Sequence, residues 1–447
     1  MQETDNIKTK IDFGSKAFKR YFTNTSWLLA ERIVRLGINL FINLYVIRYL
    51  GPEEFGLLSY AISFASIFAT ISTLGLDNLL IRELVKEPDK RDALLGSAFT
   101  LKIIGAIISF ALITIALLFS NDSGYTVILI LIIAASTLFQ TFNVIDFYFQ
   151  SQVQAKFSVY VQFTSSVMLM LIKLLMIYLN APLIWFAVAF TLESFLWAIG
   201  FSAVYKKNHL KIFSWKFNKD IALQLLKDSW PLILSGVVIA VYMKIGQVIV
   251  KKLMDDQQVG YYAAAVKLSE AWYFIPMAIS TSLFPAIVNA KKVSKELYQD
   301  RMQKLYDLLA WIAIAIAVPV TFFSDLIVKI LLGTEYLPSA PVLTIYIWAG
   351  VSTFLGVASS QYLINENLTK LAFYRTLIGM VVNIILNFAL IPAYGIVGSA
   401  VATLVSYSLA TFSIGISKNT FLQLKMMLKS IFMITAIKHI AGKWKSR

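Results

Sequence analysis

Positively charged side chains recur inside long apolar segments of this sequence. The candidates for binding an anion there are Arg32, Arg35, Lys173, Lys244 and Lys267. If these segments cross a membrane, each cation at mid-bilayer costs about 2.5–3.5 kcal/mol on insertion scales, so it requires a wet interior or a partner. Arginine and lysine hold phosphate groups through charge-assisted hydrogen bonds. We therefore expect these residues to line a water-accessible cavity that receives an anionic ligand.

Neutral and acidic polar side chains accompany these cations in the same segments. The set is Asn39, Asn43, Gln140, Asn143, Asp146, Gln247 and Glu270. At helical spacing, Arg32, Arg35, Asn39 and Asn43 fall within an arc of about 80°, which makes one polar stripe. Lys244 and Gln247 share a face of another helix by the same rule. Amide groups at such positions can hydrogen-bond a polar ligand, so we expect a polar cavity wall.

Simpler roles compete for several of these residues. Arg32 and Arg48 lie near the ends of their segments and could extend to the headgroup region. Lys102 could make a structural ion pair. Lys267 and Glu270 are three residues apart on one predicted helix and could neutralise each other. Arg35, Lys173 and Lys244 are the hardest to explain without a ligand.

Composition excludes most other classes of protein. Of 447 residues, 58% are hydrophobic and 15% are charged, whereas an average soluble domain has about 25% charged residues. The net charge of +15 lies between apolar segments, so it indicates membrane topology rather than nucleic-acid binding. The chain has no cysteine, no phosphate-binding loop, and only two distant histidines, His209 and His439. We expect no cofactor, no metal site and no enzymatic activity.

The apolar segments predict an all-α membrane protein with 12 transmembrane helices in two six-helix lobes. The predicted spans are 27–50, 56–76, 94–119, 125–149, 158–179, 182–204, 228–254, 261–290, 306–324, 342–364, 369–391 and 395–417. Most of the 40 Lys and Arg residues lie in the termini and in alternate loops. The positive-inside rule then places both termini in the cytoplasm.

An internal repeat divides the chain. When Gly56 is placed over Gly260, residues 53–61 resemble residues 257–265. Parallel repeats of this kind predict two lobes about an axis normal to the membrane, with a site between them. The predicted divisions are a cytoplasmic segment 1–26, an N-lobe 27–204, a basic cytoplasmic inter-lobe loop 205–227, a C-lobe 228–417 and a basic tail 418–447.

The tail is the ambiguous part of the predicted topology. Residues 421–440 are apolar but contain Lys425, Lys429 and Lys438. Such a pattern favours an interfacial helix on anionic lipid over a thirteenth span.

Several motifs resemble one known family. Residues 48–61 read RYLGPEEFGLLSYA, residues 259–270 read VGYYAAAVKLSE, and residues 392–400 read PAYGIVGSA. Together with WYFIP at 272–276 and LGTEY at 332–336, they resemble O-antigen and polysaccharide flippases of the Wzx type. These belong to the polysaccharide transporter family of the multidrug/oligosaccharidyl-lipid/polysaccharide (MOP) exporter superfamily. The likeness covers nearly the whole chain.

The resemblance implies a function for the predicted cavity. It implies a multi-pass protein of the bacterial inner membrane that moves undecaprenyl-pyrophosphate-linked oligosaccharide, such as an O-antigen unit for lipopolysaccharide, from the cytoplasmic to the periplasmic leaflet. Membrane lipid, polysaccharide polymerase machinery and a coupling ion, either a proton or sodium, are the partners it suggests. One departure concerns Lys244 and Gly246, where the family often carries arginine and then an acid. An ion-coupling role for position 246 therefore does not carry over.

Two other functions remain open from the sequence. A cation-coupled multidrug exporter of the same fold is expected to place acids, rather than an excess of cations, in its cavity. A membrane-embedded polysaccharide polymerase or ligase is expected to carry a large outward loop with catalytic residues, whereas the outward loops here are short.

Overall fold

A computed structural model describes the backbone of residues 16–432 and the side chains of residues 37–432. In this part of the chain the structure is built of helices joined by short connections. Their bounds are α1 Lys16–Thr73, α2 Asp77–Lys86, α3 Arg91–Leu118, α4 Gly124–Ala134, α5 Ser136–Gln140, α6 Val144–Ser151, α7 Ala155–Tyr178, α8 Leu183–Lys207, α9 Lys219–Leu253, α10 Asp256–Glu270, α11 Phe274–Lys291, α12 Lys295–Leu331, α13 Ser339–Asn365, α14 Thr369–Phe412 and α15 Phe421–Ile431.

The described residues form 10 helical stretches that are long and apolar enough to cross a membrane. Two of them are bent at glycine. The backbone leaves helical geometry at Gly51 (φ 68°, ψ 175°), just before Pro52, and again at Gly395 (φ 57°, ψ −143°). These positive φ values suit glycine, which has no Cβ. Both bends fall where the sequence predicts a boundary between two spans. The prediction of an all-α, multi-pass membrane protein is confirmed, and twelve separate spans remain a prediction.

Three elements differ from the predicted spans. The span predicted at 125–149 is divided into α4, α5, a 3₁₀ turn at Thr141–Asn143, and α6. The span predicted at 261–290 is interrupted between α10 and α11. Helix α9 begins at Lys219, so the non-helical link between the lobes is shorter than predicted. Hydropathy detects a continuous apolar segment but is blind to such local changes of backbone geometry.

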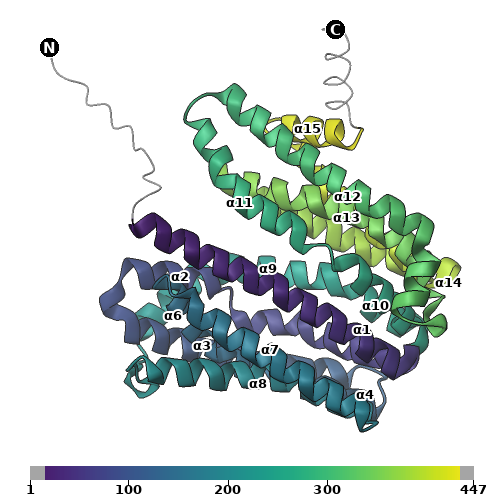
Figure 1. The fold of residues 1–447 in the computed structure, drawn as a ribbon, viewed down its shortest axis with the longest axis horizontal. Coiled ribbons are helices and arrows are strands. Elements are labelled where there is room, and N and C mark those ends of the chain that lie inside the picture. Colours follow the sequence, from purple (N-terminus) through teal and green to yellow (C-terminus); the bar gives the residue numbers. More distant parts are fainter. Residues whose placement is uncertain (1–15, 433–447) are drawn as a thin grey trace.

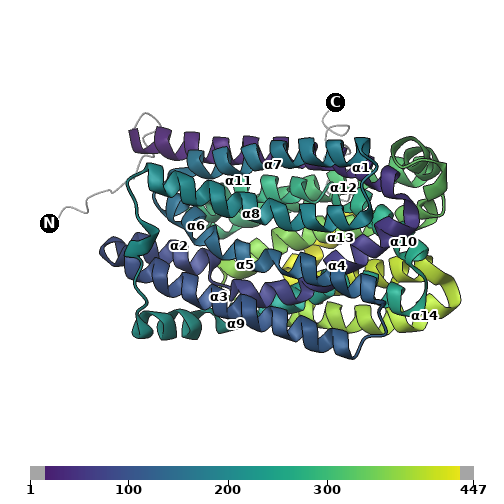
Figure 2. The same cartoon turned by 90° about the horizontal axis from the view of Figure 1, so that it is seen from below.

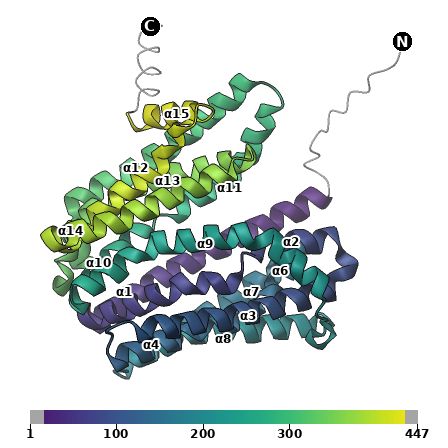
Figure 3. The same ribbon diagram turned by 180° about the vertical axis from the view of Figure 1, so that it is seen from behind.

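The helices form two groups that run along the longest axis of the molecule (Figures 1 and 2). We call α1–α8 the N-lobe and α9–α14 the C-lobe. Helix α9 lies between the groups (Figures 1 and 3), where it packs against α1 and α14. One end of the molecule, the basic end, carries the connections 87–90, 152–154, 208–218, 292–294 and 366–368. The other, the junction end, carries both glycine bends and the connections 119–123, 179–182 and 332–338.

The lobes meet at the junction end through a close crossing of α1 and α10. A Cβ atom built on Gly56 would lie 1.8 Å from the carbonyl oxygen of Asp256, and one built on Gly260 would lie 1.8 Å from that of Pro52. The contact is reciprocal, because the sequence repeat pairs Gly56 with Gly260 and Pro52 with Asp256. Such reciprocity is what a twofold relation between the lobes produces.

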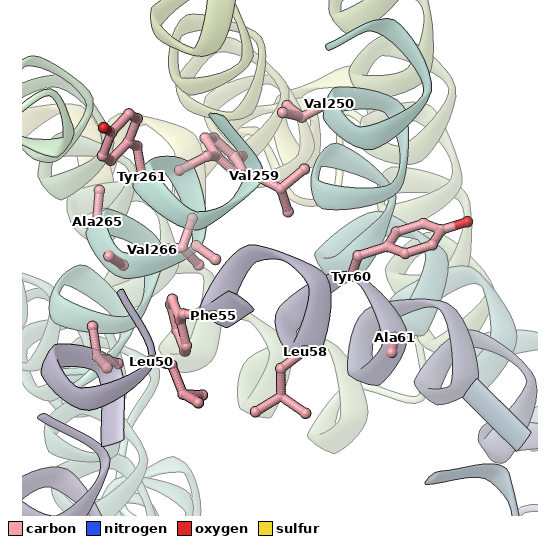
Figure 4. Packing of buried hydrophobic residues seen from close by; sticks show 14 of the residues in the cluster. Leu50, Phe55, Leu58, Tyr60, Ala61, Val250, Val259, Tyr261, Ala265 and Val266 are labelled. Carbon is pink, nitrogen blue, oxygen red and sulfur yellow. The ribbon is translucent and has the colours of Figure 1, made fainter. Parts of the chain in front are cut away.

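Buried apolar side chains distinguish the two ends of the molecule. At the junction end, one hydrophobic cluster joins both lobes, and Figure 4 shows Phe55 of α1 and Val266 of α10 within it. Toward the basic end the clusters are separate. One gathers N-lobe residues together with Ala222 and Leu225 from the start of α9, and the other gathers residues of α11–α13 and α15. The lobes therefore share a core at the junction end and have independent cores at the basic end.

Helix α15 of the basic tail docks on α12. The Tyr306 hydroxyl donates to Gln423 Oε1 at 2.9 Å, and the Ser430 hydroxyl donates to the buried carboxylate of Asp307 at 2.7 Å. The opposite face of α15 leaves Phe421 and Lys425 exposed. The interfacial helix predicted for the tail stays a prediction, because its end at 433–440 lies outside the described residues.

Candidate functional site

Three of the predicted cavity lysines lie within electrostatic reach of one another. Lys267 of α10 interacts with the charges of Lys244 on α9 and Lys173 on α7. It also interacts with the carboxylates of Glu270, on its own helix, and Glu193, on α8. The charged groups therefore come from both lobes. We call these five residues the central charge cluster.

Lys267 is the exposed residue in a run of α10 whose neighbours from Val259 to Ser269 are buried. Lys173 and Lys244 are half-buried. A lysine can remain charged inside a membrane protein when its ammonium group faces water in a hollow rather than acyl chains. Because the lobes have separate cores at the basic end and a shared core at the junction end, a path for water to Lys267 would open at the basic end.

The lysines of the cluster are available to a ligand. Among the described residues, no carboxylate lies within the 4.0 Å of an ion pair from Lys173, Lys244 or Lys267. Three lysines against two glutamates leave an excess of one positive charge in the cluster. A multivalent anion would be attracted by this excess, and the absence of tight pairing means that no internal salt bridge must break first.

The other two predicted cations, Arg32 and Arg35, belong to helix α1. The side chains of Arg32 and Arg35 lie outside the described residues, so their role as cavity cations stays a prediction. Asn39 and Asn43 lie further along the same helix and are half-buried. Helix α1 as a whole packs against α9 and α10, the helices that carry Lys244 and Lys267.

The remaining predicted polar residues have different surroundings. Gln247 is buried at the lobe interface, where its side-chain oxygen accepts a hydrogen bond from the Ser63 hydroxyl of α1. This places Gln247 in the contact between the lobes. Gln140 lies near Ser136 and Ser194, and Asn143 is half-buried in the 3₁₀ turn that precedes α6.

Asp146 is buried within the N-lobe. Its carboxylate accepts hydrogen bonds from the hydroxyl of Ser158 on α7 and from Nε2 of Gln150 at 3.0 Å. The turn at Thr141–Asn143 changes the helical phase between Gln140 and Asp146, so the polar stripe predicted for one straight helix is not continuous.

Two further cations have structural partners. Lys102 is 3% exposed and donates to Asp77 Oδ1 at 2.7 Å, with its ammonium group 4.7 Å from the centre of the Phe147 ring. This is the structural ion pair that the sequence left open. Arg48 donates to the carbonyl oxygen of Ile330 on α12 and so joins the two lobes at the junction end. Neither cation belongs to the central charge cluster.

Sequence reasoning did not assign two charged residues to a site. Glu193 is an acid within a predicted span, but its proximity to Lys173 becomes visible only when α7 packs on α8. Arg375 falls near a predicted span end, yet the residue is 7% exposed, and its guanidinium donates to the Ser359 and Ser360 hydroxyls at 2.6 Å each. Arg375 thereby ties α13 to α14 inside the C-lobe.

The surroundings of Gly246 bear on the departure from the family motif. A Cβ atom there would lie 2.9 Å from the Tyr262 hydroxyl, which itself lies 3.2 Å from Thr403 Oγ1. A carboxylate-bearing side chain at position 246 would therefore have to displace Tyr262. This chain is packed for glycine at that position.

Comparisons with known proteins agree with this architecture. The family model described as "Polysaccharide biosynthesis protein" matches residues 22–291, and the MatE model matches residues 231–389. A solved structure of the lipid II flippase MurJ, in its inward closed conformation, superposes with a TM-score of 0.70 at 20% identity and covers 94% of this chain and 93% of that chain. At this identity the likeness supports the fold.

Curated relatives match about half of the chain or less. An uncharacterized membrane protein of Methanocaldococcus jannaschii is 28% identical over 224 residues, which are 47% of this chain and 48% of that protein. A probable low-salt glycan biosynthesis flippase of Haloferax volcanii is 26% identical over 182 residues, 40% of this chain and 38% of that protein. The chain thus spans less than half the length of each of these relatives. Because the first family model covers more than half of the chain, this protein belongs to the polysaccharide biosynthesis protein family.

Proposed function

We propose that this protein is a flippase for a lipid-linked oligosaccharide and that the central charge cluster receives the phosphate headgroup. The observation that supports this most strongly is a set of three lysines from two lobes, one of them exposed, that have no ion pair with any carboxylate in the described part of the chain. Oxygen atoms of a pyrophosphate accept hydrogen bonds from such ammonium groups. Asn39 and Asn43, on the neighbouring α1, are then placed to contact sugar hydroxyls.

The substrate that we propose is an undecaprenyl-pyrophosphate-linked oligosaccharide, such as an O-antigen or another surface-polysaccharide repeat unit. It enters from the basic end, which the positive-inside rule assigns to the cytoplasm of a bacterial cell. The lobes then separate at the junction end and release it to the periplasmic leaflet. The polyprenyl tail stays in the bilayer throughout. A polysaccharide polymerase downstream would use the delivered unit. The excess of cations argues against a cation-coupled multidrug exporter.

A reconstituted transport assay tests this proposal. Purified protein in liposomes is given a fluorescent oligosaccharide on undecaprenyl pyrophosphate, and its movement between leaflets is followed with a membrane-impermeant quencher. We expect flipping that depends on the protein, with slower flipping when the carrier is a monophosphate, because fewer oxygen atoms then reach the lysines. Transport of a cationic drug without movement of the lipid-linked sugar would instead support the multidrug exporter.

A further inference from the structure

The connection between α8 and α9 is fixed against the N-lobe by its aromatic side chains. Trp215 donates from Nε1 to the Tyr205 hydroxyl at 3.1 Å. The centre of its ring lies 5.3 Å from the centre of the Phe99 ring on α3, and 5.8 Å from that of Tyr205. Tyr205 is fully buried in the N-lobe cluster. The middle of the connection is therefore tied to the N-lobe core.

The backbone of the same connection is also fixed, because it runs directly over α3. The amide of Lys216 donates to the Asp92 carbonyl at 3.1 Å, and the amide of Asn218 donates to the Ser97 hydroxyl at 3.0 Å. A Cβ atom built on Gly96 would lie 2.5 Å from the Lys216 carbonyl oxygen, so the two segments touch. Side chains that point outward from this connection are therefore presented by a backbone with defined partners.

The outward side of the connection is both aromatic and strongly cationic. Phe213 is fully exposed, and Phe217 is 56% exposed. Residues 205–219 contain no acid and five exposed lysines: Lys206, Lys207, Lys211, Lys216 and Lys219. In the described part of the chain, no carboxylate lies within the 4.0 Å of an ion pair from any of these five. We call Phe213, Phe217 and the five lysines the anchor surface.

The anchor surface continues into one exposed face of α9. This helix has 35 residues, so it is about 52 Å long and exceeds the roughly 30 Å of a hydrocarbon core. Helical spacing places five exposed residues on that face, in the order Lys219, Leu223, Lys227, Trp230 and Leu234. The lysines come first, the tryptophan follows, and leucine comes last. Tryptophan is enriched where a helix crosses from headgroups to acyl chains, so the face passes from the basic end into lipid.

We propose that the anchor surface docks on anionic phospholipid in the leaflet at the basic end. Phe213 and Phe217 enter the boundary between headgroups and acyl chains, and the lysines bind lipid phosphates through charge-assisted hydrogen bonds. Two observations favour membrane lipid as the occupant. The charge of the surface is opposite to that of the headgroups, and the surface is continuous with the lipid-facing side of α9.

Docking would attach one lobe to the leaflet. The connection is held on α3, and Ala222 and Leu225 at the start of α9 are packed in the N-lobe cluster. The anchor surface therefore moves with the N-lobe. This inference does not depend on which ligand the protein transports.

Electrostatics determines the expected size of the effect. A lysine close to an anionic membrane surface favours docking by about fivefold, so removing three of the five should weaken the docking equilibrium by about 100-fold. Salt should weaken docking too, because the Debye length falls from about 10 Å at 0.1 M to about 3 Å at 1 M ionic strength. The insertion of the two phenylalanines is less sensitive to salt than the contacts of the lysines.

The test reports where the connection lies in lipid discs of two compositions. Ser214→Cys is labelled uniquely in the cysteine-free full-length chain with an environment-sensitive fluorophore, beside an intact Phe213. The discs contain phosphatidylcholine alone, or phosphatidylcholine with phosphatidylglycerol, and a lipid with a spin label near its headgroup quenches the fluorophore. We expect strong quenching in the anionic discs, weak quenching in the neutral discs, and relief of quenching at 1 M salt.

Two changes to the anchor surface should abolish the strong quenching. The first replaces Lys206, Lys207 and Lys211 together by glutamine, and the second is Phe213→Ser. All four side chains are exposed, so neither change disturbs the packed core. The matched control replaces Lys292 and Lys295, exposed lysines of the connection between α11 and α12, by glutamine and should leave quenching at position 214 unchanged.

A label at Asn121→Cys, in the connection 119–123 at the junction end, should respond equally to both kinds of disc. Equal quenching at position 214 in neutral and anionic discs would overturn the inference. Equal loss of quenching in the Lys292 and Lys295 control would overturn it as well, because net charge alone would then be responsible. A fluorophore at position 214 that stays in water in every disc would also overturn it and leave the surface to a soluble acidic partner.

Discussion

Replacing Lys244 and Lys267 together by glutamine is expected to abolish flipping of the lipid-linked oligosaccharide while the protein still folds and inserts. Each lysine contributes a charge-assisted hydrogen bond to the headgroup, and such bonds are worth about 1.5–3 kcal/mol each. Losing both lowers headgroup affinity by at least about 100-fold. Neither lysine has an ion-pair partner among the described residues, so their removal leaves no carboxylate newly stranded at short range. The measurement is the rate of flipping in proteoliposomes at matched protein content.

A matched control uses a lysine outside the central charge cluster. Lys329 is exposed at the junction end of α12, and Lys329→Gln should flip at the wild-type rate. The single variant Lys267→Arg keeps the charge and should retain part of the activity, because the guanidinium also binds phosphate. Wild-type flipping by the double glutamine variant would remove these lysines from the account.

Alanine at Gly56 or Gly260 is expected to open the junction end. The added methyl group would lie 1.8 Å from a backbone carbonyl oxygen in either case, and a backbone atom cannot rotate away as a side chain can. The helices α1 and α10 must move apart, which costs about 1–3 kcal/mol in the packed state. The closed junction then becomes about 5- to 150-fold less populated relative to the open one. We expect flipping to be lost in both variants, because the transport cycle needs the closed junction.

Accessibility of the lobe interface measures that shift. The chain contains no cysteine, so a single cysteine at Ser63, which contacts Gln247 in the closed junction, can be labelled uniquely. In the Gly56→Ala background it should react faster with a membrane-impermeant thiol reagent added at the junction end. Gly124 is the control glycine, because nothing lies within 4 Å of a Cβ built there. Unchanged labelling in the Gly56 and Gly260 variants would show that this crossing is not the gate.

The sequence was sufficient to predict the membrane fold and the main divisions of its helices. Apolar length identified the spans, and Gly-Pro punctuation identified the bend at Gly51. It could not reveal that α10 stops at Glu270 or that a 3₁₀ turn precedes α6. These breaks arise from the way individual carbonyl and amide groups pair, and hydropathy averages over them.

The sequence could predict the environment of a residue only where the residue's own charge determines it, and not where the environment depends on a partner from another helix. Lys244 and Lys267 carry charges that are costly in an apolar environment, so the sequence predicts a wet interior for them, and this stays a prediction. Gln247 and Asp146 are polar residues whose hydrogen bonds can come from a neighbouring helix. Their partners, Ser63 and Ser158, lie on other helices, and only tertiary packing brings them together. The repeat aligned Gly56 with Gly260 in the sequence, and the structure then showed that each packs tightly against the backbone of the other lobe.

The most direct test of the central claim asks whether water reaches position 267 from the basic end. Lys267→Cys, alone in the cysteine-free chain, is treated with an impermeant anionic thiol reagent in vesicles of each orientation. Asn121→Cys, in an exposed connection at the junction end, reports the opposite side. The account predicts that position 267 reacts when the basic end faces the reagent and is protected when the junction end does, with Asn121 giving the reverse pattern. Reaction at position 267 only from the junction end, or from neither side, would contradict a hollow open at the basic end.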